Sequence, residues 1–220
     1  KRNDALAQIE EAPMPALTLA TLTMLAPRGR DDYLAHLAGP GKAELDKAGI
    51  LQSKLRLCHF LAQIAHESGG FTVKEESLNY KTSKRLMQVW PKRFPTVAST
   101  KPFLGQPTKL GDKVYGGRMG NKDPGDGFKY RGRGYLQTTG RDAYKRFGDL
   151  IDEDLESNPS LVAEPEISLH CAVAEWTESK VNKPADADDL RTVTKLVNGG
   201  LIGLAERKQW LAKAKGLFDA

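Results

Sequence analysis

Residues 53–71 read SKLRLCHFLAQIAHESGGF, and this stretch decides the fold. Its apolar residues recur at the spacing of a helical face, which predicts a helix over 53–68. Glycines follow at positions 69 and 70, where helices commonly end because glycine adopts the left-handed conformation without strain. The stretch therefore predicts a helix that ends abruptly, after which the chain reverses. The residues with helical spacing are Leu55, Cys58, Leu61, Ala62 and Ala65.

The same spacing predicts helices on both sides of this stretch. The chain has 220 residues, which suits one domain with a sizeable core. We therefore expect an all-α (mainly α) protein with a single domain over 1–220, in which 1–50 forms a helical N-terminal part. The further helices are expected at 165–180, 187–197 and 204–218, with shorter ones near 17–25, 30–38, 42–48, 83–90 and 141–147.

The region between Gly116 and Gly140 differs from the rest, because it holds 8 of the 21 glycines. Such a density does not sustain a helix, since each interior glycine costs about 1 kcal/mol relative to alanine. We expect a loop or a small hairpin that brings backbone close to a ligand. Aromatic and arginine side chains alternate near its end, and long ordered loops of this kind are usually functional. They are Phe128, Tyr130, Arg131, Arg133 and Tyr135.

Composition limits the kinds of partner. Charged residues make up 28% of the chain, and no apolar run has the length needed to cross a bilayer, so we expect no stable membrane insertion. The net charge of +5 suits an anionic partner, but the charge is spread along the chain, and we expect no nucleic-acid binding. The two cysteines, Cys58 and Cys171, lie among apolar residues and are expected to be buried, reduced thiols.

Two carboxylates, Glu67 and Glu76, lie on either side of the glycine turn. Glu67 falls in the last turn of the predicted helix, where the negative end of the helix dipole favours an uncharged carboxyl group. The chain reversal can place Glu76 across a cleft from it. Glycoside hydrolysis needs such a pair, one carboxyl as acid and the other as nucleophile or base. The residues alone leave open both stereochemical outcomes, and also the possibility that both side chains are ordinary surface groups.

Other chemistries find little support in the sequence. A zinc-binding helix that began at His66-Glu67 would need a second histidine at position 70, which is Gly70. The other histidines form no ligand cluster at short spacing. The chain also lacks the Gly-x-Ser-x-Gly elbow and the phosphate-binding loop. We therefore expect no metal and no cofactor.

Four strings occur in a fixed order over roughly 53–215: FLAQIAHESGGF (60–71), EESLNY (75–80), YRGRGYLQTTG (130–140) and VNGG (197–200). Together they resemble glycoside hydrolase family 19, which includes plant-type chitinases and many phage endolysins. Residues 115–134 are especially similar to the phage and bacterial branch. The resemblance implies a lysozyme-like helical fold with a substrate cleft and an inverting mechanism.

The resemblance also implies roles for individual residues. Glu67 is the implied acid, Glu76 the base, and Thr139 the residue that holds the attacking water. Arg207 matches an arginine near the acid. The implied substrate contacts are Gln137 and Asn198, with Tyr130, His66 and Tyr80 from the matching strings. Ala143 and Ile202 depart from the family pattern at positions that bear on substrate contacts.

The implied substrate is the β-1,4-linked glycan strand of peptidoglycan, and its cleavage would lyse bacterial walls. Chitin or chitooligosaccharide is the alternative, since it shares the aminosugar backbone. Two further hypotheses are a lytic transglycosylase, which would not need Glu76, and a wall-binding module without activity. We expect a monomer that is made in the bacterial host cytoplasm and acts on the wall at its periplasmic or extracellular side.

Overall fold

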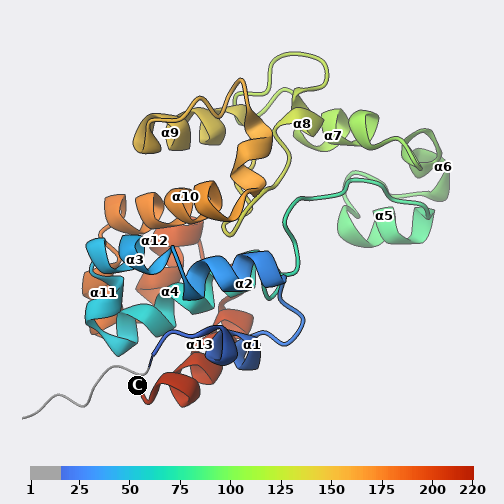
Figure 1. The fold of residues 1–220 in the computed structure, drawn as a ribbon. Coiled ribbons are helices and arrows are strands. Elements are labelled where there is room, and N and C mark those ends of the chain that lie inside the picture. Colours follow the sequence, from blue (N-terminus) through green and yellow to red (C-terminus); the bar gives the residue numbers. More distant parts are fainter. Residues whose placement is uncertain (1–15) are drawn as a thin grey trace, which may run out of the picture.

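The computed structural model describes residues 16–220 and consists of helices joined by loops, with no strand longer than an isolated bridge in that part. A larger body of packed helices carries a smaller lobe formed by α5 to α8 (Figure 1). Most of the helices predicted from the sequence are present within a few residues of their expected ends. The body contains α1 (Leu19–Leu25), α2 (Asp31–Ala38), α3 (Lys42–Lys47), α4 (Lys54–Glu67), α9 (Arg141–Ile151), α10 (Pro165–Glu178), α11 (Asn182–Asp186), α12 (Leu190–Asn198) and α13 (Leu204–Phe218).

Helix α4 runs through the middle of the body. Its residues from 57 to 65 are all buried, so the helix is covered on every side and not only on the face that the sequence pattern indicated. Helices α13, α11 and α12 pack around it, with the short 3-10 helix η1 (Ile50–Gln52) at its start. Ser53 caps the N-terminus by accepting a hydrogen bond from the backbone N–H of Arg56. A helix held in this way gives the residues at its C-terminus a fixed position.

The turn after α4 forms as the sequence predicts. Gly69, Gly70 and Phe71 all have positive φ, at 58°, 72° and 63°. The hydroxyl of Ser68 donates to the carbonyl of Ile64 at 2.6 Å and accepts from the N–H of Phe71 at 3.0 Å. The Phe71 ring is buried and meets Tyr135 edge to face. The reversal is therefore anchored to the core at both ends.

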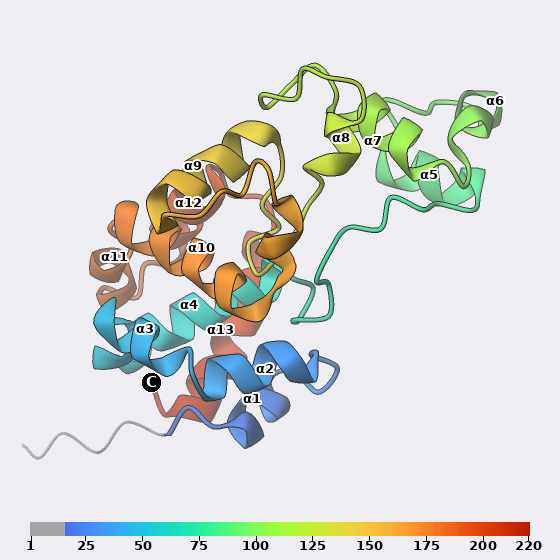
Figure 2. The ribbon, with the colours of Figure 1, turned by 45° about the horizontal axis from the view of Figure 1, so that its top comes forward.

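The smaller lobe has its own apolar cluster of buried residues. It contains α5 (Ser83–Val89), α6 (Val97–Thr100), the 3-10 helix η2 (Lys101–Phe103), α7 (Pro107–Tyr115) and α8 (Asp126–Lys129). Only α5 was expected from the sequence. Figure 2 shows the lobe projecting beyond the body, connected by the segment that follows the turn. The buried residues of the cluster are Leu78, Leu86, Phe94, Leu110 and Val114.

The expectation of an entirely non-helical glycine region is wrong at α8, which forms a single helical turn. The reason lies in a close backbone contact between α7 and α8. A Cβ on Gly127 would stand 2.2 Å from the carbonyl oxygen of Gly111, and a Cβ on Gly111 would stand 2.6 Å from the N of Phe128. These two glycines let the helices approach closely, and the packing offsets the low helix propensity of glycine.

The predicted small hairpin is present at the end of the glycine region. Arg133 and Thr138 exchange backbone hydrogen bonds at 3.2 and 2.9 Å. The same stretch pairs with the segment after the turn, since the N–H of Glu76 donates to the carbonyl of Gly132 at 2.8 Å and the N–H of Gly134 donates to that of Lys74 at 3.0 Å. The hairpin therefore positions Glu76 through the backbone.

Both cysteines are buried and unpaired, as expected, and burial raises the pKa of each thiol to about 12. Their place in the core agrees with the apolar helical pattern around them. Within residues 16–220, no helix combines the length and the apolar character that a membrane span requires.

The Gly111–Gly127 contact predicts a large effect of a single methyl group. Gly127→Ala should lower the free energy of unfolding by about 1–3 kcal/mol, the usual cost of overpacking, because neither backbone can give way. Gly216→Ala in α13 is the matched control, since a Cβ there meets nothing within 4 Å. It should leave stability unchanged or raise it by up to about 1 kcal/mol. Urea denaturation of both variants measures the difference, and equal stabilities would contradict the prediction.

Candidate active site

Glu67 is the last residue of α4 and is held by a buried arginine. Arg207 of α13 is only 1% exposed. Its Nη2 donates to Oε1 of Glu67, and its Nη1 donates to the side-chain oxygen of Gln63. The side chain of Glu67 keeps 20% of its surface exposed. The carboxyl group of Glu67, which reaches solvent, is therefore held in place by the buried positive charge of Arg207.

His66 packs between α4 and the start of α13. A Cβ on Gly203, which has a φ of 74°, would stand 2.3 Å from Nε2 of His66, so only a glycine leaves room for the ring. Its Nδ1 lies 3.2 Å from Oε2 of Glu206. On the other side of the turn, a Cβ on Gly70 would stand 3.1 Å from the Trp210 ring. Helix α13 therefore packs its first turns against the end of α4 that carries Glu67.

Glu76 is held from the opposite direction by Tyr115, the last residue of α7. The phenolic O–H stands 3.1 Å from both carboxylate oxygens. Burial raises the pKa of Glu76, and the hydrogen bonds from Tyr115 and the backbone oppose that rise only in part. A carboxylate whose pKa is raised is a stronger proton acceptor than an exposed one.

Glu75, the neighbour of Glu76, has a different role. It pairs with both Arg131 and Arg133, and the hydrogen bonds from these guanidinium groups outweigh desolvation and lower its pKa. Arg133 also donates to the hydroxyl of Tyr144, which in turn donates to the carbonyl of Arg131. Glu75 therefore fastens the glycine-rich segment, and the two adjacent glutamates are not a simple exposed pair.

Gln137 and Thr139 gather around Gly132, whose carbonyl holds the N–H of Glu76. A Cβ on Gly132 would lie 2.9 Å from the side-chain oxygen of Gln137 and 3.3 Å from the hydroxyl of Thr139. Gln137 donates to the carbonyls of Val73 and Gly134 at 3.2 and 3.0 Å. Thr139 donates to the carbonyl of Gln137 at 2.8 Å and remains partly exposed. The structure thus brings the predicted base, the amide and the hydroxyl to one hairpin.

The other predicted contact residues lie in different surroundings. Tyr80 is half-buried against Trp90, with ring centroids 5.3 Å apart, and burial together with the nearby Glu76 raises its pKa. Asn198 is exposed at the end of α12. Tyr130, in contrast, is 2% exposed and donates to the carbonyl of Glu156, so its ring belongs to the core and not to a substrate-facing surface. Ile202 is 83% exposed.

Sequence reasoning missed two residues of this site, Tyr115 and Gln63. Tyr115 lies 39 residues beyond Glu76 in a helix that the sequence pattern did not indicate, so nothing local points to it. Gln63 has a weak signal, since it is four residues before Glu67 and therefore shares its helical face. Among residues 16–220, no three His, Cys, Asp or Glu side chains gather in a way that could hold a metal ion.

Comparison with known proteins identifies relatives of this chain, although no family model matches it. A glycosyl hydrolase family 19 domain-containing protein of Haemophilus influenzae is 38% identical over 167 residues, which span 75% of this chain and 80% of that protein. An endochitinase of Pisum sativum is 30% identical over 138 residues, or 61% of this chain and 36% of the pea protein.

Solved structures share the fold at low sequence identity. Chitinase C of Streptomyces griseus gives a TM-score of 0.58 at 18% identity and covers 93% of this chain and 77% of its own. A bacterial family 19 chitinase gives 0.54 at 20% identity, with 93% of this chain and 95% of that one covered. The lysozyme-like helical architecture expected from the sequence is therefore confirmed.

The contact between Tyr115 and Glu76 predicts the effect of removing one hydroxyl group. The phenol stabilises the charged carboxylate, so Tyr115→Phe should raise the pKa of Glu76 further, and the proton should be lost at higher pH than in the parent. Carbon-detected NMR titration of the Glu76 carboxyl measures the change. Tyr130→Phe is the control, because its hydroxyl binds Glu156 and not Glu76. A lower or unchanged pKa in Tyr115→Phe would refute the assignment.

Proposed function

This chain belongs to glycosyl hydrolase family 19 and is a glycoside hydrolase, and we propose that it cleaves the β-1,4 bonds of peptidoglycan glycan strands with inversion. The observation that carries this proposal is a pair of carboxyl groups that are held from opposite directions on either side of one chain reversal. Glu67 lies at the end of α4 against Arg207 of the body, whereas Glu76 lies beside Tyr115 of the smaller lobe. Glycoside hydrolysis by inversion needs two carboxyl groups held separately, one to give a proton and the other to take a proton from water.

In the proposed reaction, Glu67 gives its proton to the glycosidic oxygen as the bond to the anomeric carbon breaks. Glu76 takes a proton from a water molecule, and the oxygen of that water attacks the opposite face of the same carbon. The hydroxyl of Thr139 can orient the water, since a hydroxyl both donates and accepts hydrogen bonds. One displacement inverts the anomeric centre, and it leaves Glu67 ionised and Glu76 protonated until water exchanges the protons.

Peptidoglycan is favoured over chitin by three features of the chain. The glycine-rich segment 115–134 resembles phage endolysins, the net charge of +5 suits an anionic envelope, and positions 143 and 202 carry Ala and Ile in place of the expected polar residues. Chitin is the second candidate, because the pea relative and the structural neighbours carry chitinase in their names. We further propose that the protein acts as a monomer on the bacterial wall after synthesis in the host cytoplasm.

The proposed roles of Glu67 and Glu76 predict that replacing either residue lowers turnover to a similar extent. Glu67→Gln and Glu76→Gln should each lower kcat on purified peptidoglycan by about 10²–10⁴-fold, the usual contribution of a positioned acid or base. Glu153→Gln, at an exposed position away from the pair, should retain full activity. Mass spectrometry of the products should show one added water at each cleaved bond.

Other outcomes would identify the alternatives. Near-full turnover by Glu76→Gln, with anhydro sugars as products, would indicate a lytic transglycosylase. Cleavage of chitohexaose without cleavage of peptidoglycan would indicate a chitinase. Binding to walls without release of any fragment, by the parent protein as well as by Glu67→Gln, would indicate a wall-binding module.

A further inference from the structure

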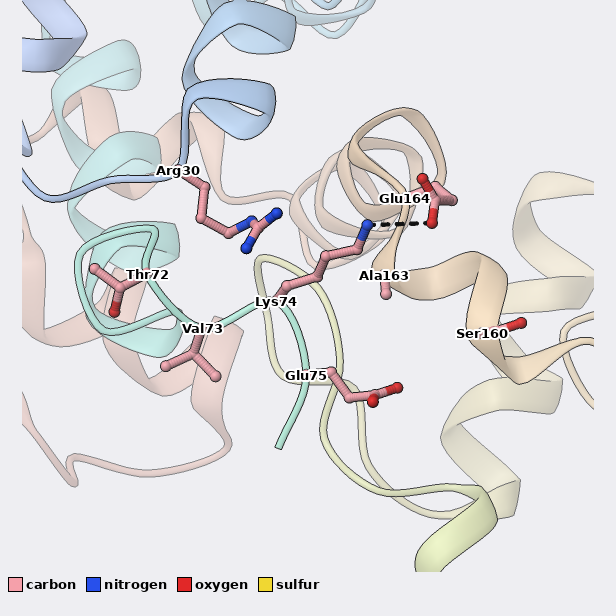
Figure 3. Close-up of a pocket in the computed structure, with 8 residues that line it drawn as sticks. All are labelled: Arg30, Thr72, Val73, Lys74, Glu75, Ser160, Ala163 and Glu164. Atoms are coloured by element: carbon pink, nitrogen blue, oxygen red, sulfur yellow. Dashed lines mark hydrogen bonds and ion pairs between the residues drawn. The ribbon is translucent and has the colours of Figure 1, made fainter. Parts of the chain in front are cut away.

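A pocket of about 490 Å³ opens beside the segment that joins Glu67 to Glu76. Its lining includes Lys74 and Glu75 from that segment, Arg30 from the residue before α2, and Glu164 from the residue before α10. Figure 3 shows the side chains of Arg30, Lys74 and Glu164 reaching into the same space from three different parts of the chain. None of these three residues has a role in the proposed acid–base chemistry.

The pocket carries charges of both signs. Arg30 pairs with Asp32 at 3.0 Å, and Lys74 pairs with Glu164 at 3.2 Å. All four side chains are between 28% and 57% exposed. Ion pairs this exposed contribute little to stability, so a ligand with complementary charges can replace them at small cost. The pocket is thus suited to a flexible ligand that carries both carboxylates and an ammonium group.

The two cations are fixed to the catalytic segment through the backbone. The N–H of Arg30 donates to the carbonyl of Phe71 at 3.0 Å, and the carbonyl of Lys74 accepts from Gly134 of the hairpin at 3.0 Å. Lys74 is also two residues before Glu76, so their Cα atoms are at most about 7 Å apart. A ligand group bound here would therefore lie close to the backbone that carries the proposed base.

We propose that this pocket binds the stem peptide of peptidoglycan, an inference that rests on the proposed function. Alternate sugars of the strand carry a lactyl-linked peptide, so one peptide leaves the strand within a sugar of every cleaved bond. Four extended residues reach about 13–14 Å, which exceeds the separation of Lys74 and Glu76. Arg30 and Lys74 bind the peptide carboxylates, and Glu164 binds the ammonium group of a diamino residue. Chitin carries no such group.

The test compares intact strands with strands stripped of peptide by an amidase. In the double variant Arg30→Gln/Lys74→Gln, the ratio of kcat/KM on intact strands to that on stripped strands should fall about tenfold, the effect expected when charge-assisted hydrogen bonds are lost. The control is Arg28→Gln/Lys183→Gln, which removes the same charge at two exposed positions outside the pocket lining. Lys183 lies on α11, at the far end of the body from the catalytic segment (Figure 1). Its ratio should match that of the parent.

A binding measurement makes the proposal independent of turnover. A tripeptide of alanine, γ-linked glutamate and diaminopimelate, added to the full chain, should shift the backbone amide signals of Arg30 and Lys74, and Glu164→Gln should weaken this binding. If the parent cleaves both kinds of strand while the double variant keeps the parental ratio and the tripeptide shifts nothing, the stem-peptide site is refuted and the proposed function stands. If the parent cleaves only chitohexaose, the proposed function fails, and the stem-peptide site fails with it.

Discussion

The buried guanidinium group of Arg207 is the interaction on which the site depends. A charge with 1% exposure is tolerated only when it is paired and hydrogen-bonded, and here Gln63 and Glu67 of α4 supply both partners. The pair joins α4 to α13, which lie side by side along the core. Because each group needs the other, neither helix can slide without leaving a charge unpaired. The carboxyl group of Glu67 is therefore positioned by the packing of α4 against α13 and not by the loop that follows it.

The second carboxylate, Glu76, is positioned by a different set of contacts. Its backbone is paired with Gly132, and the hairpin that supplies Gly132 is fastened by Glu75 to two arginines. A glycine is needed at position 132, because a side chain there would displace Gln137 and Thr139. The glycine at position 132 thus allows a close contact between backbone and polar side chains, and its carbonyl accepts the hydrogen bond from the N–H of Glu76.

The sequence was most informative where structure is local. Amphipathic spacing predicted α4, α10 and α13 almost to the residue, and the pair of glycines predicted the turn that separates the carboxylates. It failed at α8, where the contact between Gly111 and Gly127 overrides helix propensity. It also failed at Tyr130, an aromatic residue in a polar segment that packs on Tyr144. Both failures involve partners distant in sequence, which no local pattern reveals.

The contacts that hold Glu67 and Glu76 come from different parts of the molecule, and this affects the pKa of Glu76. Glu67 is fixed by α13 of the body, whereas the phenol that contacts Glu76 ends α7 of the smaller lobe. The position of α7 depends in turn on its glycine contact with α8 and on the apolar cluster of the lobe. Any movement of the lobe relative to the body would change the hydrogen bond to Glu76 without touching Glu67. The pKa of Glu76 therefore depends on burial and on a hydrogen bond from the lobe, whereas the hydrogen bond to Glu67 comes from the body.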